Sequence, residues 1–236
     1  MSFPEALPER LEALESWMAE HAPMTHAVLN PGAEDTDLDA FETELGLTLP
    51  GDFRMLYRWH DGQTESVLTT EPGVFGLTFL PLERVREQWR GLRDTLSDDP
   101  QVNAEVAQLD EQFSYPAGHI REVFIDTGRV PFCSTDDWNA VGIDLNPGPL
   151  GTVGQVITFG QDEHRKYVLA GSLGEFIGEY VRRLEQGRVR VYQPDGDRFP
   201  DEPFTLELQA ASPDGAEPAR GTLADLFPGF GASPTQ

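Results

Sequence analysis

The segment 41–62, FETELGLTLPGDFRMLYRWHDG, constrains the fold more than any other part of the chain. It holds the end of one helix and the start of another, separated by Leu49-Pro50, which cannot continue a helix. Asp37 is placed to cap the first helix, and Gly46 supplies the positive φ that ends it. Apolar residues recur between them at helical spacing: Leu38, Phe41 and Leu45.

The second helix is expected to start just after Pro50. Asp52 lies in its first turn, where a carboxylate interacts favourably with the helix dipole, and Gly62 marks the end of the run. The apolar and aromatic positions again share one face: Phe53, Leu56, Tyr57 and His60. Two short helices therefore meet at a proline elbow, residues 46–51.

The rest of the chain alternates helical and strand patterns. Helices are predicted for residues 5–21, 82–96 and 172–186, and an inserted helix for residues 98–113. Short strands are predicted at 74–79, 123–125, 130–133, 140–145, 155–159 and 167–170. Strands spaced this closely favour an antiparallel meander over parallel crossovers. The predicted fold class is therefore α+β, with an antiparallel or mixed sheet flanked by helices.

We expect one domain over residues 1–187, with an inserted segment at 97–119, and a C-terminal extension over residues 188–236. The extension begins with two alternating segments, 188–192 and 204–208, which are predicted to pair as a hairpin. An acidic tail rich in Pro and Gly follows. Within it, residues 222–230 are expected to form a last apolar turn that docks on the domain.

Several short motifs carry a family resemblance. The front half consists of an acidic residue, Leu-Gly, Leu-Pro and then Asp61-Gly62. The back half reads RVPF at 129–132, VGIDL at 141–145 and GTVGQV at 151–156, followed by a helix. In this order the motifs resemble the SMI1/KNR4 family, also called the SUKH superfamily, over most of residues 38–187, which implies an SMI1/KNR4-like fold. We assign structural roles in these motifs to Gly46, Pro50, Asp61, Gly62, Pro131, Gly151 and Gly154.

The formal net charge of −24 bears on the kind of partner the chain would accept. A field of this sign repels nucleic-acid phosphates and anionic lipid, and it speeds encounter with a basic protein. It is equally consistent with a solvated surface that serves solubility alone. The helix predicted at 82–96 carries one of the few basic patches, whose arginines are expected to pair with neighbouring acids.

Cys133 is the only cysteine, so no internal disulfide and no cysteine-based zinc site is expected. Its apolar flanks predict a buried, inert thiol. No apolar run approaches the roughly twenty residues that span a bilayer, and residues 1–5 lack the features of a signal peptide. These observations predict a cytoplasmic protein and leave the oligomeric state open.

Several clusters invite a chemical interpretation, and each has a plainer structural one. His60 and Asp61 are adjacent, so on a helix they point about 100° apart, and a structural histidine is expected. The glycines at 148, 151 and 154 precede a strand, which favours turns over a phosphate-binding loop. The acids near 162–164 and 195–202 lack metal-ligand spacing. We therefore predict no catalytic residue, no metal site and no cofactor.

One turn, Asp136-Asp137-Trp138, has the composition of a protein-binding anchor, because a large aromatic stands beside two carboxylates. Asp144 and Glu163 are further acidic candidates for contact with a partner. The alternative for Trp138 is that its ring folds back on the sheet.

The family resemblance implies a non-enzymatic protein-binding module. Bacterial members are largely inferred to be immunity proteins that neutralise toxins of polymorphic or contact-dependent systems, and a basic toxin domain would suit the acidic charge. Fungal members regulate cell-wall synthesis through protein contacts. We expect an immunity protein, and the alternative is an intracellular regulator or scaffold that binds an endogenous protein. A hydrolase or transferase is disfavoured by the lack of nucleophile–base or metal-ligand spacing.

Overall fold

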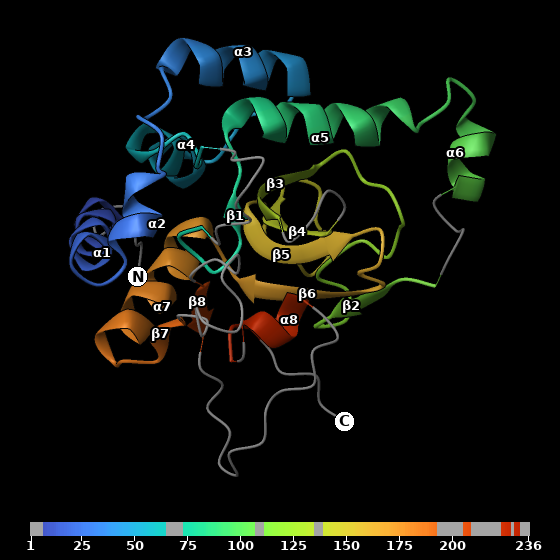
Figure 1. The fold of residues 1–236 in the computed structure, drawn as a ribbon. Helices are drawn as coiled ribbons and strands as arrows, with labels where there is room; N and C mark the ends of the chain where they lie inside the picture. The colour runs from blue at the N-terminus through green and yellow to red at the C-terminus, as the bar shows by residue number, and fades with distance from the viewer. Residues whose placement is uncertain are drawn as a thin grey trace, which may run out of the picture.

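Four strands form an antiparallel meander through the middle of the protein (Figure 1). The computed structural model describes residues 7–64, 73–106, 111–134, 139–192, 205–208, 223–227 and 229–231. The meander consists of β3 (Arg129–Ser134), β4 (Asn139–Asp144), β5 (Gln155–Gly160) and β6 (Arg165–Ala170). At its edges β1 (Thr78–Phe79) pairs antiparallel with β3, and β2 (Phe113–Tyr115) pairs parallel with β6. The result is a mixed sheet in the order β1-β3-β4-β5-β6-β2. The sequence predicts an antiparallel or mixed sheet, and it does not predict the edge strand β2.

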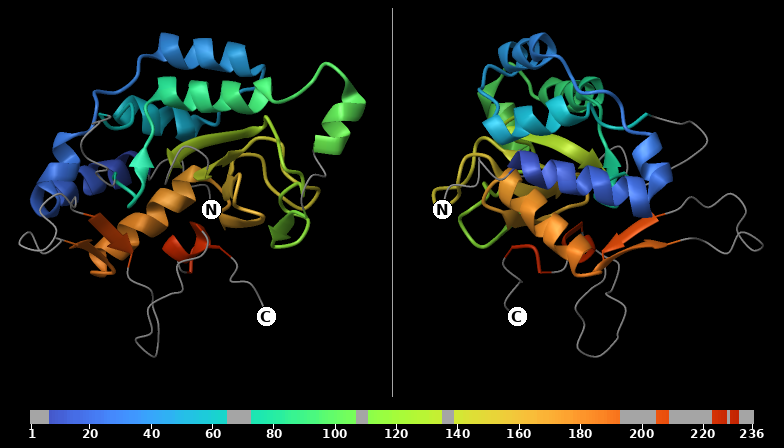
Figure 2. Two further views of the ribbon diagram at one scale, coloured as in Figure 1. Left: turned by 45° about the vertical axis from the view of Figure 1, so that its right-hand side comes forward. Right: turned by 90° about the vertical axis from the view of Figure 1, so that its left-hand side faces the viewer.

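Helices pack around this sheet on several sides. α3 and α5 run side by side above it, and α7 crosses it next to α1 (Figures 1 and 2). The fold is therefore α+β, with the sheet flanked by helices. Their bounds are α1 (Leu7–His21), α2 (Pro23–Ala27), α3 (Asp35–Leu45), α4 (Gly51–Trp59), α5 (Leu82–Asp94), α6 (Pro100–Val106), α7 (Leu173–Glu185) and α8 (Leu223–Leu226).

The elbow forms where the sequence predicts it. α3 ends at Gly46, whose φ is 65°, and α4 begins directly after Pro50. The prediction that Asp37 caps α3 is wrong, because the helix already begins at Asp35 and no side chain caps it. Asp37 instead lies in the first turn, where its charge still favours the positive end of the helix dipole.

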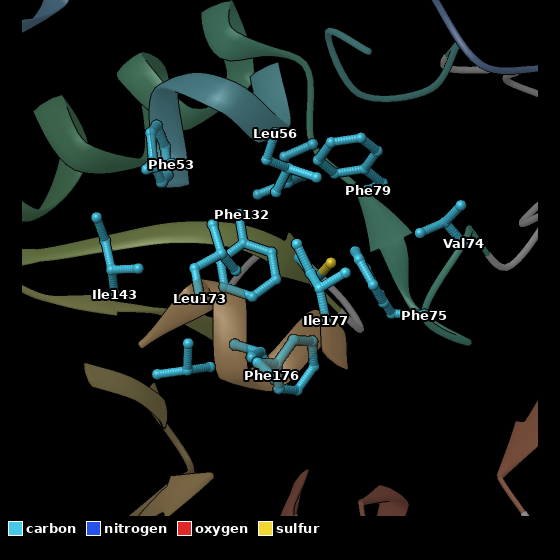
Figure 3. Close-up of a cluster of buried hydrophobic side chains, with 14 of the residues drawn as sticks. Phe53, Leu56, Val74, Phe75, Phe79, Phe132, Ile143, Leu173, Phe176 and Ile177 are labelled. Carbon is cyan, nitrogen blue, oxygen red and sulfur yellow. The ribbon is translucent and has the colours of Figure 1, made fainter. Parts of the chain in front are cut away.

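The main core lies between α4, α7 and the sheet (Figure 3). Each fully buried apolar side chain of this size contributes about 1.5–3 kcal/mol relative to exposure. Side chains from the two helices meet around Phe132 of β3; they include Phe53, Leu56, Phe176 and Ile177. The apolar stripes predicted for both helices therefore face one common core.

The strand predicted at 74–79 is shorter in the structure. Only Thr78–Phe79 pairs with β3, because the preceding residues turn back, with the N–H of Gly76 donating to the carbonyl of Gly73 at 2.9 Å. This turn carries Phe75 into the core, where its ring centroid lies 5.1 Å from that of Tyr180. The apolar run at this point is therefore mostly a packed turn.

The inserted helix is also shorter than predicted. α6 covers only Pro100–Val106, and none of its residues is buried, since it lies at the edge of the molecule (Figure 1). Phe113, expected at the end of this helix, instead begins β2 and pairs with Arg165 of β6. Pairing with a sheet edge overrides the helical spacing of the apolar residues here.

Residues 123–125 form no strand, contrary to the prediction. The guanidinium of Arg129, which is buried, donates to the carbonyl of Arg121 at 2.7 Å and to that of Val123 at 3.2 Å. The N–H of Val123 also donates to the carbonyl of Arg121 at 2.9 Å. The backbone groups of Val123 therefore bond to Arg129 and Arg121 and not to a neighbouring strand.

The arginines of α5 pair with acids, as the sequence predicts. Glu44 of α3 accepts hydrogen bonds from Arg90 at 2.5 Å and from Arg86 at 3.3 Å, which joins the two parallel-running helices. On α5 itself, Arg84 donates to Glu87 at 2.7 Å. Because these pairs are partly exposed, each contributes only about 0–1 kcal/mol. They align α3 with α5 more than they stabilise the fold.

The C-terminal extension forms the predicted hairpin from β7 (Val189–Tyr192) and β8 (Thr205–Leu208). Beyond it, Phe227 and Phe230 are buried and pack against Phe176 of α7, with ring centroids 5.5 and 5.2 Å away. The expected docking of an apolar turn is therefore confirmed for the described part of residues 222–230. The domain boundary at 187 and the inserted segment at 97–119 stay predictions.

We predict that Gly62→Val lowers the free energy of unfolding by about 3 kcal/mol, measured by urea denaturation. Gly62 has a φ of 64°, and a Cβ at this position would collide with the backbone of Leu80 and Pro81. Gly46→Val is the matched control, because Gly46 has a φ of 65° and no other atom within 4 Å of the added Cβ. The control should lose only about 1–2 kcal/mol. Equal losses would contradict the close packing at Gly62.

Candidate functional site

Two sequence motifs that lie far apart along the chain meet at one surface. The elbow between α3 and α4 touches the loop between β4 and β5, because a Cβ built on Gly154 would lie 3.2 Å from Cγ of Pro50. Gly154 also has a φ of 87°, which favours glycine. We call the exposed apolar residues of these two touching segments, Leu47, Leu150 and Val153, the motif face.

The motif face is strongly exposed. Leu150 and Val153 are 66% and 63% accessible to solvent, and Leu47 is 40% accessible. Single exposed apolar residues are normal on a protein surface, whereas several on adjoining loops are typical of a contact surface. The arrangement therefore suits binding to another macromolecule.

A buried polar network holds the β4–β5 loop in place. Asp144 accepts hydrogen bonds from the N–H of Asn146 at 3.0 Å and from the side chain of Gln155 at 3.1 Å. Gln155 also donates to the carbonyl of His119 at 2.9 Å and accepts from the N–H of Thr152 at 3.1 Å. Because both ends of the loop are tied down, the apolar side chains are presented on a pre-organised frame.

Asp144 is therefore a support for this loop rather than a contact residue. It is 1% accessible, so the expectation that its carboxylate binds a partner directly is wrong. Burial raises the pKa of Asp144, while the N–H of Asn146 and the charge of Arg129 oppose that change. The sequence prediction failed because a carboxylate at the end of a strand looks the same whether it faces solvent or its own loop.

Glu163 is also buried, and its carboxylate accepts a hydrogen bond from the N–H of Leu223 at 2.7 Å. It lies at the other end of the sheet from Asp144, since neighbouring Asp162 bonds to Asn139 at the start of β4. A direct role for Glu163 in binding a partner is therefore not supported either. The structure does not bring the two predicted acids together.

Asp136, Asp137 and Trp138 lie outside the described residues, so their proposed role as an anchor stays a prediction. The described residues on either side, Ser134 and Asn139, are at the end of the sheet opposite the motif face.

The other motif residues have structural roles. Asp61 accepts a hydrogen bond from the N–H of Leu82 at 2.6 Å, so it caps α5 from a distant part of the chain, and burial raises its pKa. Pro131 lies where the β3–β4 register shifts, which accommodates a residue without an N–H. Gly151 donates to the carbonyl of Gly148 at 3.0 Å within the β4–β5 loop.

A cluster that the sequence did not reveal joins the N-terminal helices to the end of α4. Glu15 of α1 accepts hydrogen bonds from His26 at 2.5 Å and from His60 at 2.9 Å. Burial works against ionisation of Glu15, and the two histidines outweigh it, so the pKa of Glu15 lies below its usual value. The other ring nitrogen of His60 bonds to the carbonyl of Asn30 at 2.6 Å. His60 is thus a structural residue, as predicted, whereas the carboxylate of Asp61 bonds to the N–H of Leu82.

The described residues include neither a cluster of metal ligands nor an accessible thiol. Among them, no group of three or more His, Cys, Asp or Glu side chains is arranged to hold a metal ion. Cys133 is fully buried, and burial raises the pKa of its thiol, in agreement with the predicted inert cysteine. No helix in the described part of the chain is long and apolar enough to cross a membrane.

Sequence reasoning missed the motif face itself. Leu150 and Val153 stand inside a turn rich in Gly and Pro, where an apolar side chain has no helical or strand face to occupy. The apolar residues within this turn were the one sequence signal that could have indicated the motif face. Their exposure depends on how the elbow and the loop pack, which periodicity does not indicate.

Together, the mixed sheet, the proline elbow and the loop against it define an α+β protein of the SMI1/KNR4-like class. The model of the SMI1 / KNR4 family (SUKH-1) matches residues 32–179, so the chain belongs to this family. The match includes the elbow, the β4–β5 loop and most of α7.

Fungal relatives share this part of the chain. The fission yeast (Schizosaccharomyces pombe) protein named "Cell wall biosynthesis/cell cycle regulator smi1" is 33% identical over 199 residues, which cover 82% of this chain and 39% of that protein. "Cell wall assembly regulator SMI1" of Saccharomyces cerevisiae is 26% identical, covering 79% of this chain and 42% of that protein. "Glucan synthesis regulatory protein" of Neurospora crassa is 28% identical, covering 75% and 38%.

This chain thus spans about two fifths of the length of these relatives. Their names describe regulators rather than enzymes, which agrees with the expectation of a non-enzymatic family. They support the alternative of a regulator that contacts an endogenous protein, and they do not support the first expectation, a toxin-neutralising immunity protein.

We predict that the double variant Leu150→Ser/Val153→Ser changes the free energy of unfolding by no more than about 0.5 kcal/mol, because both side chains are already in water. Chemical denaturation checks this. Gln155→Leu is the contrasting variant, since it removes the hydrogen bond that Gln155 donates to Oδ2 of buried Asp144 and should cost about 1–3 kcal/mol. A large loss in the double variant would mean that the motif face serves stability.

A pH prediction concerns Lys166, which is 1% accessible and donates to Gln112 and to the carbonyl of Glu163. Burial and the charge of Arg129 lower the pKa of Lys166 from 10.5 to about 7. Between these values the unfolded chain binds more protons than the folded protein, so stability rises with pH across this window, by up to about 1 kcal/mol per unit.

The measurement is the free energy of unfolding between pH 7 and 9.5 for the wild type and for Lys166→Met. The variant removes this titration while other groups stay the same, so its curve should rise less steeply. Parallel curves would show that Lys166 keeps its charge in the folded protein.

Proposed function

We propose that this chain is a non-enzymatic regulatory module that binds an endogenous intracellular protein, in a process related to cell-wall synthesis. The observation that carries the proposal is the motif face, in which Leu47, Leu150 and Val153 are exposed, the last two on a loop held by buried hydrogen bonds. Holding apolar side chains in water on such a frame has no use for stability and suits recognition.

Two further observations support binding over catalysis. His60 uses both ring nitrogens to join separate segments, and Cys133 is fully buried, so neither is placed as a free base or nucleophile. The fungal relatives are named as regulators of cell-wall assembly, cell-wall biosynthesis and glucan synthesis.

The net charge of −24 adds a preference for the partner. An acidic module attracts a basic surface over a range set by the Debye length, about 8 Å at physiological salt. The proposed partner therefore combines an apolar contact patch with a basic surround. Electrostatic attraction would first bring the partner toward this chain, and its apolar patch would then be buried against the motif face.

The test is a chimera in fission yeast, in which this chain replaces the matching region of the relative smi1. The wild-type chimera should restore cell-wall glucan content and growth relative to a strain that lacks the region. The same chimera with Leu150→Ser/Val153→Ser should fail to restore them, because a contact surface loses its anchors.

The matched control is Met24→Ser/Val102→Ser, which removes two other exposed apolar side chains, on α2 and α6. This control should behave as the wild type. Failure of the wild-type chimera at normal protein level would contradict a shared regulatory function. Restoration by the motif-face variant would show that binding uses another surface.

A further inference from the structure

The C-terminal segment 223–231 contacts the rest of the protein as a docked peptide would. It begins with α8 and turns at its end, where the N–H of Phe230 donates to the carbonyl of Phe227 at 3.0 Å. It lies beside β6 and α7 in the ribbon views (Figures 1 and 2). Its local shape is thus a short helical turn followed by a tight bend.

Most of the side chains that hold this segment come from residues 163–183, and α8 also lies against β4. Glu163 accepts a hydrogen bond from the N–H of Leu223 at 2.7 Å. Phe176 packs against two aromatic rings of the segment, and the guanidinium of Arg183 lies 4.3 Å from the centre of the Phe230 ring. We call this surface, formed by residues 163–183 and the adjoining part of β4, the C-groove.

The contacts define what the C-groove accepts. Three side chains of the segment are buried, Leu223, Phe227 and Phe230, whereas Leu226 faces solvent. Gly231 runs so close to the carbonyl of Val168 that an added Cβ would collide with it. The recognised pattern is therefore Leu, then Phe four and seven residues later, followed by a residue that lets the backbone approach the sheet.

The family match offers a reason to treat this segment as separable. The SMI1 / KNR4 model covers residues 32–179, which includes most of the C-groove and ends well before residue 223. The C-groove thus belongs mainly to the shared fold, and the segment that fills it here lies outside the matched region.

We propose that the C-groove is a peptide-binding site, occupied in this chain by its own segment 223–231, and that it binds a partner protein presenting the same Leu and Phe spacing. This inference rests on the proposed protein-binding function and names a second surface for it. Cation–π contact by Arg183 and the aromatic wall of Phe176 favour Phe over aliphatic side chains at the buried positions.

A partner protein fits better than a second copy of this chain. The tethered segment competes at an effective concentration in the millimolar range, and an identical segment from another copy gains nothing over it. A partner displaces the tethered segment only if its own peptide binds more tightly. The segment therefore sets an affinity threshold for the partner.

The experiment uses the full chain and a fluorescent peptide of residues 221–232, with binding measured by fluorescence anisotropy. In the variant Phe227→Ala/Phe230→Ala the tethered competitor is weakened, so the peptide should bind at least about 10-fold more tightly than it binds the wild type. A control peptide with both Phe residues replaced by Ala should bind neither protein. If the folded variant binds the peptide no better than the wild type, the proposal is overturned.

A second measurement covers the case in which the double variant does not fold. Hydrogen–deuterium exchange on the wild type should show the amides of α8 and Phe230 opening at least about 100-fold more often than those of β4 and β5, as expected of a segment that detaches locally. Equal protection would make the segment a fixed part of the core and overturn the proposal.

Two further outcomes are distinguishable. A wild-type dimer that dissociates in the double variant would assign the C-groove to a second copy and overturn the partner assignment. The peptide assay contains no endogenous partner, so its failure would leave the result of the yeast chimera unaffected. Failure of the chimera would likewise leave peptide binding to the C-groove standing.

Discussion

The aromatic packing around Phe176 of α7 holds together segments from distant parts of the chain. The Phe176 ring meets Phe75 from the turn before β1, Phe132 from β3, and both Phe227 and Phe230 from the C-terminal segment. One side chain of α7 therefore joins the sheet, a packed turn and the chain end. Edge-to-face and tilted geometries dominate these pairs, and each adds about 0.5–1.5 kcal/mol beyond the area that it buries.

Around that core the protein separates rigid support from exposed contact. Buried polar groups such as Asp144, Gln155 and Asp61 serve loops and helix ends, because a buried carboxylate must satisfy its oxygens internally. The apolar residues Leu150 and Val153, in contrast, stand exposed on the loop that Asp144 and Gln155 support. For this reason the acids of the motifs are poor candidates for direct contact, although the chain as a whole is strongly acidic.

Helices and meander strands were predictable because their signals are local and repeated. The stripe of Leu7, Leu11, Leu14 and Met18 is buried in α1, and Ser172 caps α7, accepting from the N–H of Glu175 at 3.1 Å. The errors fell where long-range contacts override periodicity. The backbone of Val123 bonds to Arg129 and Arg121 in place of a neighbouring strand, and Phe113 pairs with the edge of β6 in place of continuing a helix. The contact residues were predicted less well than the fold, since Asp144 and Glu163 are buried.

The α+β class, the proline elbow, the meander and the family could all be predicted from the sequence, because turn chemistry and apolar spacing are properties of short segments. Which surfaces are available became clear only in the folded protein. It brings Gly154 against Pro50, so that Leu47, Leu150 and Val153 lie on adjoining segments, and it joins Glu15 to His26 and His60. The physical reason is that exposure and partner choice depend on packing between segments distant along the chain, which no local pattern records.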